Sequence, residues 1–435
     1  MRRYESYKDS GVEWLGEVPS HWDVKKLKYL AKLSPSKAEI ICNHEELCSF
    51  IPMEKLKLNT LVLDEIKQIK SVYSAYTYFR NEDLLIAKVT PCFENKNFAI
   101  AKNLVNSIGF GSSEIYVLRA YNNLFNKFLF YRLQEQNFME IAISKMSGTG
   151  GLKRVPSEFI NNFQLALPPY LEQQKIAQFL DDKTAKIDQA VDLAEKQIAL
   201  LKEHKQILIQ NAVTRGLNPD VPLKDSGVEW IGQVPEHWNV KKLKFVSKIN
   251  QHTLPENTNG SLSIKYVDIG SVSFENGIEK VENFLFKNAP SRARRLANRG
   301  DIVVSTVRTY LKAITMVKEE HQDCIFSTGF AVITSNECLE DNFFELYAKS
   351  DAFTEQVSVF SKGMSYPAIN STDLSNLWIT VPPISEQQKI ADYLEIQVSK
   401  INQAITLKTA HIEKLKEYKS VLINDVVTGK VRVSV

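Results

Sequence analysis

The sequence predicts an α+β fold in which two similar globular domains are separated by two long antiparallel coiled-coil helices, as a pseudo-two-fold internal repeat. Three observations support this prediction. The segment that opens the chain occurs a second time in its middle, and each half closes with the same long amphipathic pattern. The composition is that of a folded globular protein rather than a disordered or fibrous one.

Length and composition limit the possible classes of protein. The 435 residues suffice for two to four domains, and 44% of them are apolar while 24% are charged. The net charge of +3 excludes a uniformly basic coat for nucleic acid, so any such binding must rest on local clusters of charge.

The cysteines and the N-terminal segment bear on the compartment. No stretch approaches the roughly 20 apolar residues that a membrane span needs, and no apolar signal-peptide core follows the first residues. The cysteines are odd in number and form no CxxC pair, which argues against a disulfide framework. They are Cys42, Cys48, Cys92, Cys324 and Cys338. We therefore expect a cytoplasmic protein without a membrane partner.

The repeat defines two halves. Residues 9–33, DSGVEWLGEVPSHWDVKKLKYLAKL, occur again at 225–249 as DSGVEWIGQVPEHWNVKKLKFVSKI. Between these frames the halves diverge, although residues 83–90 still resemble residues 301–308. A duplication that only enlarged a hydrophobic core would not explain why the opening and closing segments of the two halves are so similar while the segments between them differ. The pattern instead indicates one scaffold that presents two different binding specificities.

A second repeated motif begins the long helices. LPPYLEQQKIA starts at Leu167 and VPPISEQQKIA at Val381. Proline suits a helix start and Glu172 lies in the first turn, where the helix dipole favours a carboxylate, so we predict a helix from about Leu171.

Apolar residues then recur at intervals of three and four over about 40 residues, which is typical of a coiled-coil seam. In the first helix they are Ile176, Leu180, Ile187, Val191, Ala194, Ile198, Leu201, Leu208 and Ala212, and in the second they are Ile390, Leu394, Ile401, Ile405, Ile412, Leu415, Leu422 and Val426. We expect the two helices to pack against each other. The alternative is that each pairs with another protein.

Catalytic motifs are missing. Leu167-Pro168-Pro169-Tyr170 resembles the Asn/Asp/Ser-Pro-Pro-Tyr motif of DNA amino-methyltransferases, but leucine cannot accept the amino hydrogen. The sequence contains no GxxxxGK[ST], no HExxH and no zinc-ligand spacing. His21 and His237 are repeat equivalents beside tryptophans, which favours a packing role. We therefore predict no catalytic residue and no metal site.

Clusters of positive charge supply the candidate contacts to DNA. Seven cations and one acid lie between Lys287 and Lys312, and the planar fork of arginine suits guanine edges and phosphates. In the first half, cations flank the glycines of residues 148–151, and Lys362-Gly363 has a comparable place in the second half. A charge run is more often a solvated face, which is the alternative. The predicted contacts are Lys88, Lys153, Arg154, Arg292, Arg294, Arg295, Arg308, Lys312 and Lys362.

These features together resemble the specificity (S) subunit of type I restriction-modification systems, over essentially the whole chain. The resemblance is carried by the twin openings, residues 11–22 and 227–238, and by the twin helix starts. Residues 90–95, TPCFEN, also look like a segment common in the variable domains of this family.

The resemblance implies two target-recognition domains, each reading one half of a bipartite site in double-stranded DNA. It also implies paired helices that dock two methyltransferase (M) subunits, and further restriction (R) subunits. S-adenosylmethionine, ATP and Mg would be used by these partners, and no cofactor would be bound by this chain. We predict the first recognition domain over 1–166, the first long helix over 167–216, the second recognition domain over 217–380 and the second long helix over 381–435.

Two other readings remain open at this point. One is a free-standing, two-headed DNA-binding or scaffold protein without enzyme partners, and the other is an active methyltransferase with degenerate motifs. Only the last would methylate DNA when purified alone with S-adenosylmethionine. The resemblance does not supply the residues that contact bases, because the recognition domains are the part of the family that varies.

Overall fold

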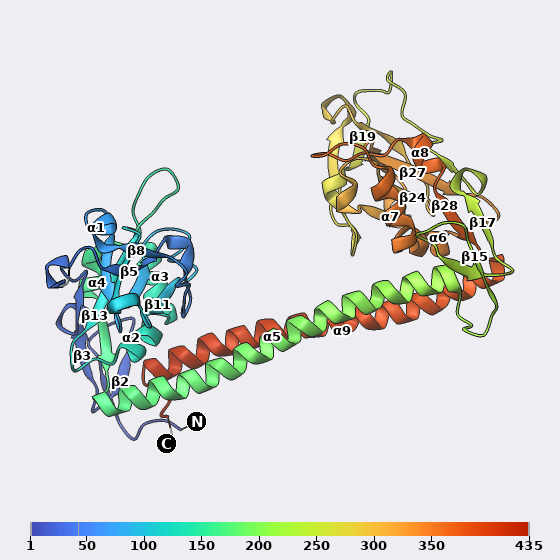
Figure 1. Cartoon of the computed structure of the whole chain (residues 1–435). Helices are drawn as coiled ribbons and strands as arrows, with labels where there is room; N and C mark the ends of the chain where they lie inside the picture. Colours follow the sequence, from blue (N-terminus) through green and yellow to red (C-terminus); the bar gives the residue numbers. More distant parts are fainter. Residues whose placement is uncertain (1, 42, 434–435) are drawn as a thin grey trace. The chain divides into compact units, whose positions relative to one another are not determined.

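The computed structural model describes residues 2–41 and 43–433, so that Cys42 lies outside the described residues (Figure 1). The chain divides into two compact units. Unit 1 comprises Met1–Ala194 and Ala410–Val435, and unit 2 comprises Glu195–Thr409. Each unit contains one globular head together with segments of two long helices, α5 (Tyr170–Arg215) and α9 (Ile384–Val427). The head of unit 1 precedes α5 in the chain, and the head of unit 2 lies between α5 and α9.

The first head is built on two four-stranded sheets. The first sheet has the order β11-β10-β13-β4 and the second the order β8-β5-β12-β9, in which β5 and β12 are parallel. The strands are β4 (Ala31–Leu33), β5 (Leu47–Ile51), β8 (Ile66–Gln68), β9 (Thr77–Arg80), β10 (Leu84–Ala87), β11 (Phe98–Ile100), β12 (Ile108–Gly111) and β13 (Ile115–Ala120). The helices of this head are α1 (Ile69–Val72), α2 (Asn126–Arg132), α3 (Gln136–Ser144) and α4 (Ser157–Asn162).

The second head repeats this topology. Its sheets have the orders β18-β27-β24-β25 and β22-β19-β26-β23, with the parallel pair again at β19 and β26. The strands are β18 (Ser247–Ile249), β19 (Ser263–Val267), β22 (Glu282–Leu285), β23 (Ala293–Leu296), β24 (Ile302–Ser305), β25 (Ile314–Met316), β26 (Cys324–Ser327) and β27 (Phe330–Ser335). The helices are α6 (Asp341–Ala348), α7 (Asp351–Phe360) and α8 (Ser371–Ser375).

Short two-stranded pairings complete both heads. In the first head they are β1 (Tyr7–Asp9) with β2 (Glu17–Pro19), β3 (Asp23–Lys26) with β14 (Gln164–Leu167), and β6 (Leu56–Lys57) with β7 (Thr60–Leu61). In the second head they are β15 (Leu223–Asp225) with β16 (Gln233–Pro235), β17 (Asn239–Lys242) with β28 (Trp378–Val381), and β20 (Val272–Ser273) with β21 (Gly277–Ile278).

The faint similarity between residues 83–90 and 301–308 marks equivalent strands. β10 (LLIA) and β24 (IVVS) are buried at every position and each lies inside its sheet. Each is preceded by a buried aspartate, Asp83 or Asp301, whose carboxylate accepts a hydrogen bond from a backbone N–H of the preceding turn. A strand that is covered on both faces favours apolar residues, and Ser305 is the one polar residue at these eight buried positions. This preference explains why the similarity persists.

The two long helices run antiparallel within each unit. α5 has 46 residues and α9 has 44. In unit 1, Ile176 and Leu180 share a core with Val426, and Lys419 Nζ lies 2.6 Å from Asp188 Oδ1. In unit 2, Lys408 donates to Gln197 at 2.6 Å and Lys205 donates to Asn402 at 3.1 Å. The predicted pairing of the helices and the predicted fold class are confirmed.

A buried glutamine joins each head to its helix. The Gln173 side chain is fully buried; its Oε1 accepts from Phe125 N at 2.7 Å, and its Nε2 donates to the carbonyls of Asn123 and Pro168. The repeat equivalent, Gln387, makes the same three bonds in unit 2, to Glu340 N and to the carbonyls of Cys338 and Pro382. One side chain thus fixes the first turn of α5 or α9 against the N-terminus of α2 or α6, and we call this set of three hydrogen bonds the glutamine clamp.

A histidine–glutamate pair reinforces this junction. His21 Nε2 lies 2.8 Å from Glu172 Oε2, and His237 Nε2 lies 2.7 Å from Glu386 Oε1. Both imidazoles also lie edge-on to the next tryptophan, although each side chain is nearly half exposed. The sequence does not reveal these histidine–glutamate contacts, because partners about 150 residues apart leave no local signal.

We expect Gln173→Ala to lower the free energy of unfolding of unit 1 by about 3 kcal/mol, because it removes three hydrogen bonds and leaves a buried N–H unpaired. Urea unfolding followed by tryptophan fluorescence measures this. The control is Gln174→Ala at the adjacent exposed position, which should cost less than about 0.5 kcal/mol. Equal losses in the two variants would contradict the role given to Gln173.

Candidate nucleic-acid interface

Each head presents a loop at the same place in its fold. The first loop (residues 147–154) connects α3 to α4, and the second loop (residues 362–368) connects α7 to α8. Arg154 forms bridges to Ser147 and Val89, and Ala368 forms the equivalent bridges to Lys362 and Val307. Each loop is therefore fastened to the segment that leaves the buried strand β10 or β24.

The first loop has a glycine-rich, exposed tip. Gly150 and Gly151 have φ of +65° and +80°, a region that side chains with a Cβ rarely adopt. Leu152 beside them is 51% exposed. Lys153 is exposed, and its backbone N–H donates to Thr90 Oγ1 at 3.0 Å. This contact brings Lys153 to the segment that also carries Lys88.

The charge of Arg154 is already paired. Its Nε and Nη2 donate to the two oxygens of Glu114 at 2.8 and 2.9 Å. The Arg154 guanidinium holds the pKa of Glu114 below its usual range, and the charge of Lys88 adds to this effect. Lys88 Nζ lies 5.1 Å from the centroid of the Tyr116 ring. Lys153 and Arg154 are thus both exposed at the loop, but Glu114 neutralises Arg154.

The second loop carries apolar and aromatic side chains in addition to charge. Met364 and Tyr366 are 103% and 66% exposed. Arg308 is exposed and stacks its guanidinium 5.3 Å from the centroid of the Tyr366 ring. Lys362 is 85% exposed, with Asp373 Oδ2 at 4.0 Å. The structure thus brings Arg308 and Lys362 to one loop surface.

Lys312 faces a different environment. It is half-buried, its Nζ donates to Thr354 Oγ1 at 3.2 Å, and it lies 5.9 Å from the centroid of the Phe274 ring. These contacts turn it toward the interior of the head and away from the loop surface.

The arginines of residues 292–295 do not form one surface. Arg292 is exposed and precedes the edge strand β23. Its carbonyl accepts from Thr328 N, and the next residue, Gly329, accepts from Thr306 N, which places Arg292 near the segment leaving β24. Arg292 is therefore exposed directly before the edge strand whose backbone adjoins this segment.

Arg294 and Arg295 pack against the head itself. The Arg294 guanidinium lies 4.8 Å from the centroid of the Phe286 ring, and Arg295 Nη1 donates to Thr253 Oγ1 at 3.2 Å. Arg294 Nη1 and Arg295 Nε are buried without a hydrogen-bond partner among the described residues. Burial lowers the pKa of Arg295. Both side chains are thus partly committed to packing, which sequence spacing alone does not reveal.

Some exposed loop residues escaped the sequence analysis. Leu152, Met364, Tyr366 and Tyr310 all lie next to the predicted cations, and Tyr310 is 61% exposed. The sequence could have indicated these residues, because each of them lies within three positions of a glycine or an arginine.

The comparisons with known proteins agree with this architecture. A family model described as the type I restriction modification DNA specificity domain matches residues 19–202 and again residues 235–417. The chain belongs to this family. Each matched range contains most of one head and the larger part of the long helix that follows it, so the duplication seen in the sequence is a duplication of this domain.

Named relatives show the same relationship. The specificity subunit of the type I restriction enzyme EcoAI from Escherichia coli is 35% identical over 195 residues, which is 44% of this chain and 32% of that protein. The chain thus spans about a third of that relative. The MjaVIII specificity subunit from Methanocaldococcus jannaschii is 25% identical over 96% of this chain and 94% of its own length. The family predicted from the sequence is therefore confirmed.

A solved structure shares the fold. It is described as showing the structural basis of complex assembly and conformational transition of the type I R-M system. The similarity covers 95% of this chain and 99% of that one, with a TM-score of 0.75 and 18% sequence identity. Within the described part of this family member, no helix combines the length and apolarity that crossing a membrane requires.

We expect Glu114→Gln to strengthen DNA binding about threefold to tenfold at low salt, because it releases the Arg154 guanidinium for a phosphate. The slope of log affinity against log salt should steepen by about one phosphate contact. Binding titrations over a salt series measure both. Glu158→Gln removes the same charge from the exposed start of α4 and serves as the control; an equal gain there would show a general charge effect only.

Proposed function

We propose that this chain is the specificity subunit of a type I restriction-modification complex, and that each head reads one half of a bipartite site in double-stranded DNA. The main support for this proposal is that the two heads share one topology and present loops at equivalent positions, whereas the side chains of the two loops differ. The first loop offers Leu152 and Lys153, whereas the second offers Met364, Tyr366 and the stacked Arg308. Equivalent positions with different chemistry suit two different base sequences.

The long helices are the proposed docking surface for two methyltransferase subunits, with restriction subunits joining the same complex. Supporting this, α5 and α9 expose apolar side chains outside their shared seam. In unit 2, Leu200 and Ile207 are 63% and 50% exposed and lie seven residues apart on α5, and Leu407 of α9 is 72% exposed. A heptad-spaced apolar stripe favours packing by another helix.

The partners would supply the chemistry. S-adenosylmethionine would be bound by the methyltransferase subunits and ATP with Mg by the restriction subunits, whereas this chain would bind DNA and set the target. Because these partners and their DNA meet in the cytoplasm, we propose that compartment for this chain. Purified alone with S-adenosylmethionine and DNA, the chain should leave the DNA unmethylated, and added methyltransferase subunit should restore methylation.

We expect Arg292→Ala to weaken DNA binding and to flatten the salt dependence by roughly one phosphate contact. Arg292 lies exposed beside the segment that follows β24. Arg299→Ala is the matched control, since that exposed arginine lies beyond the opposite end of the same strand and pairs with Glu319. Binding titrations at several salt concentrations measure both variants, and equal losses would remove Arg292 from the interface.

Removal of all three arginines by Arg292→Ala, Arg294→Ala and Arg295→Ala should weaken binding further. Part of that loss should come from the fold, because Arg294 packs on Phe286 and Arg295 bonds to Thr253. The melting temperature separates the two effects. Unchanged affinity at moderate salt in the triple variant would exclude this stretch from DNA contact.

Exchange of residues 34–160 for the equivalent segment of another family member should change one half-site only. The exchanged segment carries the loop of the first head and every strand of its two four-stranded sheets except β4. Gln173 itself stays in place, and the groups that it binds at positions 123 and 125 are backbone groups, which the incoming segment also supplies. The measurement is methylation by the assembled complex across a library of bipartite targets. A simultaneous change in the other half-site would refute the assignment of one half-site to each head.

A further inference from the structure

The junction between head and helix is closed in unit 1. Tyr131 of α2 is 3% exposed; its hydroxyl donates to Asp181 Oδ1 at 2.8 Å and lies 3.2 Å from Thr184 Oγ1. Lys127, one turn earlier on α2, forms an ion pair with the same Asp181 carboxylate. An aromatic ring and a cation from the head thus fill the space above α5, and a carboxylate on α5 holds both.

The equivalent junction in unit 2 has lost these groups. The clamps align Gln173 with Gln387 and Phe125 with Glu340, so Tyr131 corresponds to Leu346, Lys127 to Asn342, and Thr184 to Val398. Three changes at positions far apart in the sequence thus remove the ring, the cation and the hydroxyl together. Only the carboxylate persists, because Glu395 replaces Asp181.

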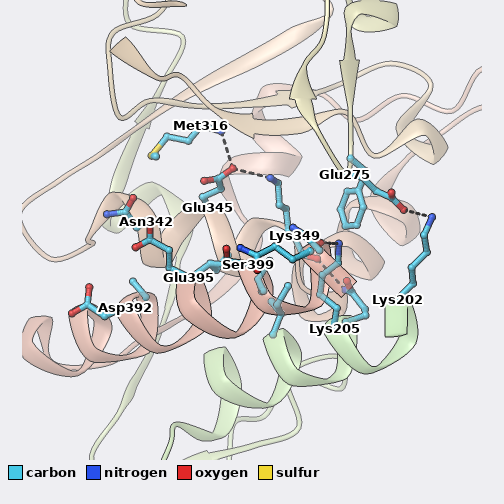
Figure 2. A pocket seen from close by; sticks show the side chains of 18 of the residues that line it. Lys202, Lys205, Glu275, Met316, Asn342, Glu345, Lys349, Asp392, Glu395 and Ser399 are labelled. Carbon is cyan, nitrogen blue, oxygen red and sulfur yellow. Dashed lines mark hydrogen bonds and ion pairs between the residues drawn. The ribbon is translucent and has the colours of Figure 1, made fainter. Parts of the chain in front are cut away.

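A cavity of about 960 Å³ occupies this junction (Figure 2). Its walls are α6, the paired segments of α5 and α9, and the β20–β21 turn, whose Glu275 reaches Lys202 at 2.9 Å. Leu346 and Val398 are only half-buried on its wall. The apolar lining further includes Ile209, Phe274, Met316 and Leu407.

The charges around the cavity are divided between its two ends. Figure 2 shows Asn342, Asp392 and Glu395 at one end and Lys202, Lys205 and Lys349 at the other. The lysine end is largely satisfied, since Lys202 pairs with Glu275, Lys349 with Glu345, and Lys205 donates to Asn402.

The carboxylate of Glu395 at the acidic end is not paired in the same way. Glu395 has no hydrogen-bond or ion-pair partner among the residues that the structure describes, whereas its counterpart Asp181 holds two. Asn342 turns its amide to Glu340 at 2.7 Å instead of toward the helix. This end therefore offers an exposed carboxylate beside half-buried apolar side chains.

We propose that this cavity is a docking site for a partner protein, which inserts an aromatic side chain between Leu346 and Val398 and sets a lysine or arginine against Glu395. The partner would present the same pair that α2 presents in unit 1, a cation and a ring four residues apart on a helix. Apolar walls with a single acidic end suit such a helix. DNA does not fit, because the acidic end would repel its phosphates.

The test uses the full chain and a fluorescent, alanine-rich helical peptide with one lysine and one tyrosine four residues apart. The control peptide carries glutamate and alanine at those positions. We expect saturable binding of the first peptide, at least tenfold tighter than that of the control, by fluorescence anisotropy. Glu395→Gln, an exposed substitution, should weaken binding about threefold to tenfold.

A sealed variant provides the decisive comparison. Asn342→Lys, Leu346→Tyr and Val398→Thr install the unit 1 groups in unit 2, so peptide binding should fall at least tenfold while the melting temperature stays equal or rises. Undiminished binding to the folded sealed variant, or binding no tighter than that of the control peptide, would overturn the proposal.

The reverse variant opens the junction of unit 1. Lys127→Asn, Tyr131→Leu and Thr184→Val should raise the stoichiometry from one peptide per chain to two. A folded variant that still binds one peptide would contradict the claim that these residues define the site. Neither experiment involves DNA or a methyltransferase, so the outcome is independent of the proposed function.

Discussion

A buried glutamine side chain at the first turn of each long helix is the constraint on which the rest of the structure depends. Gln173 and Gln387 each satisfy one backbone N–H and two backbone carbonyls at a place where head, strand end and helix meet. A buried peptide group without a partner is costly, and the amide of glutamine can serve donors and acceptors at once. This explains why the motif that follows the paired prolines is the same in both halves.

Because the junction is held by few residues, the remainder of each head is free to differ. The sheets need only a buried, mostly apolar inner strand, and both LLIA in β10 and IVVS in β24 supply one. The loops need only their bridges to that strand, and these use backbone atoms rather than particular side chains. Side chains at residues 152–154 and 364–367 can thus change without loss of the fold, whereas Gly150, Gly151 and Gly363 hold backbone conformations that other residues rarely adopt. A scaffold of this kind suits a protein whose two recognition surfaces must vary independently.

The same junction shows how the two halves have become unequal. In unit 1 the ring of Tyr131 and the charge of Lys127 close the space beside the clamp, and in unit 2 the smaller Leu346 and neutral Asn342 leave it open. Neither arrangement disturbs the glutamine itself, which is fully buried in both. The same glutamine-centred junction therefore permits the two halves to present different surfaces beside the long helices, as well as different recognition loops.

The sequence by itself determined the repeat, the fold class, the long paired helices and the family, because each is written in local periodicity or in near-identical segments. It also located the cations near the loops. Only the tertiary structure decided which of them are available, since Arg154 meets Glu114 from a distant strand and Arg294 packs on Phe286. The clamps, the histidine–glutamate pairs and the open junction were likewise beyond sequence reasoning. Their partners lie tens to hundreds of residues apart, and the physics of a contact depends on distance in space, which no local pattern encodes.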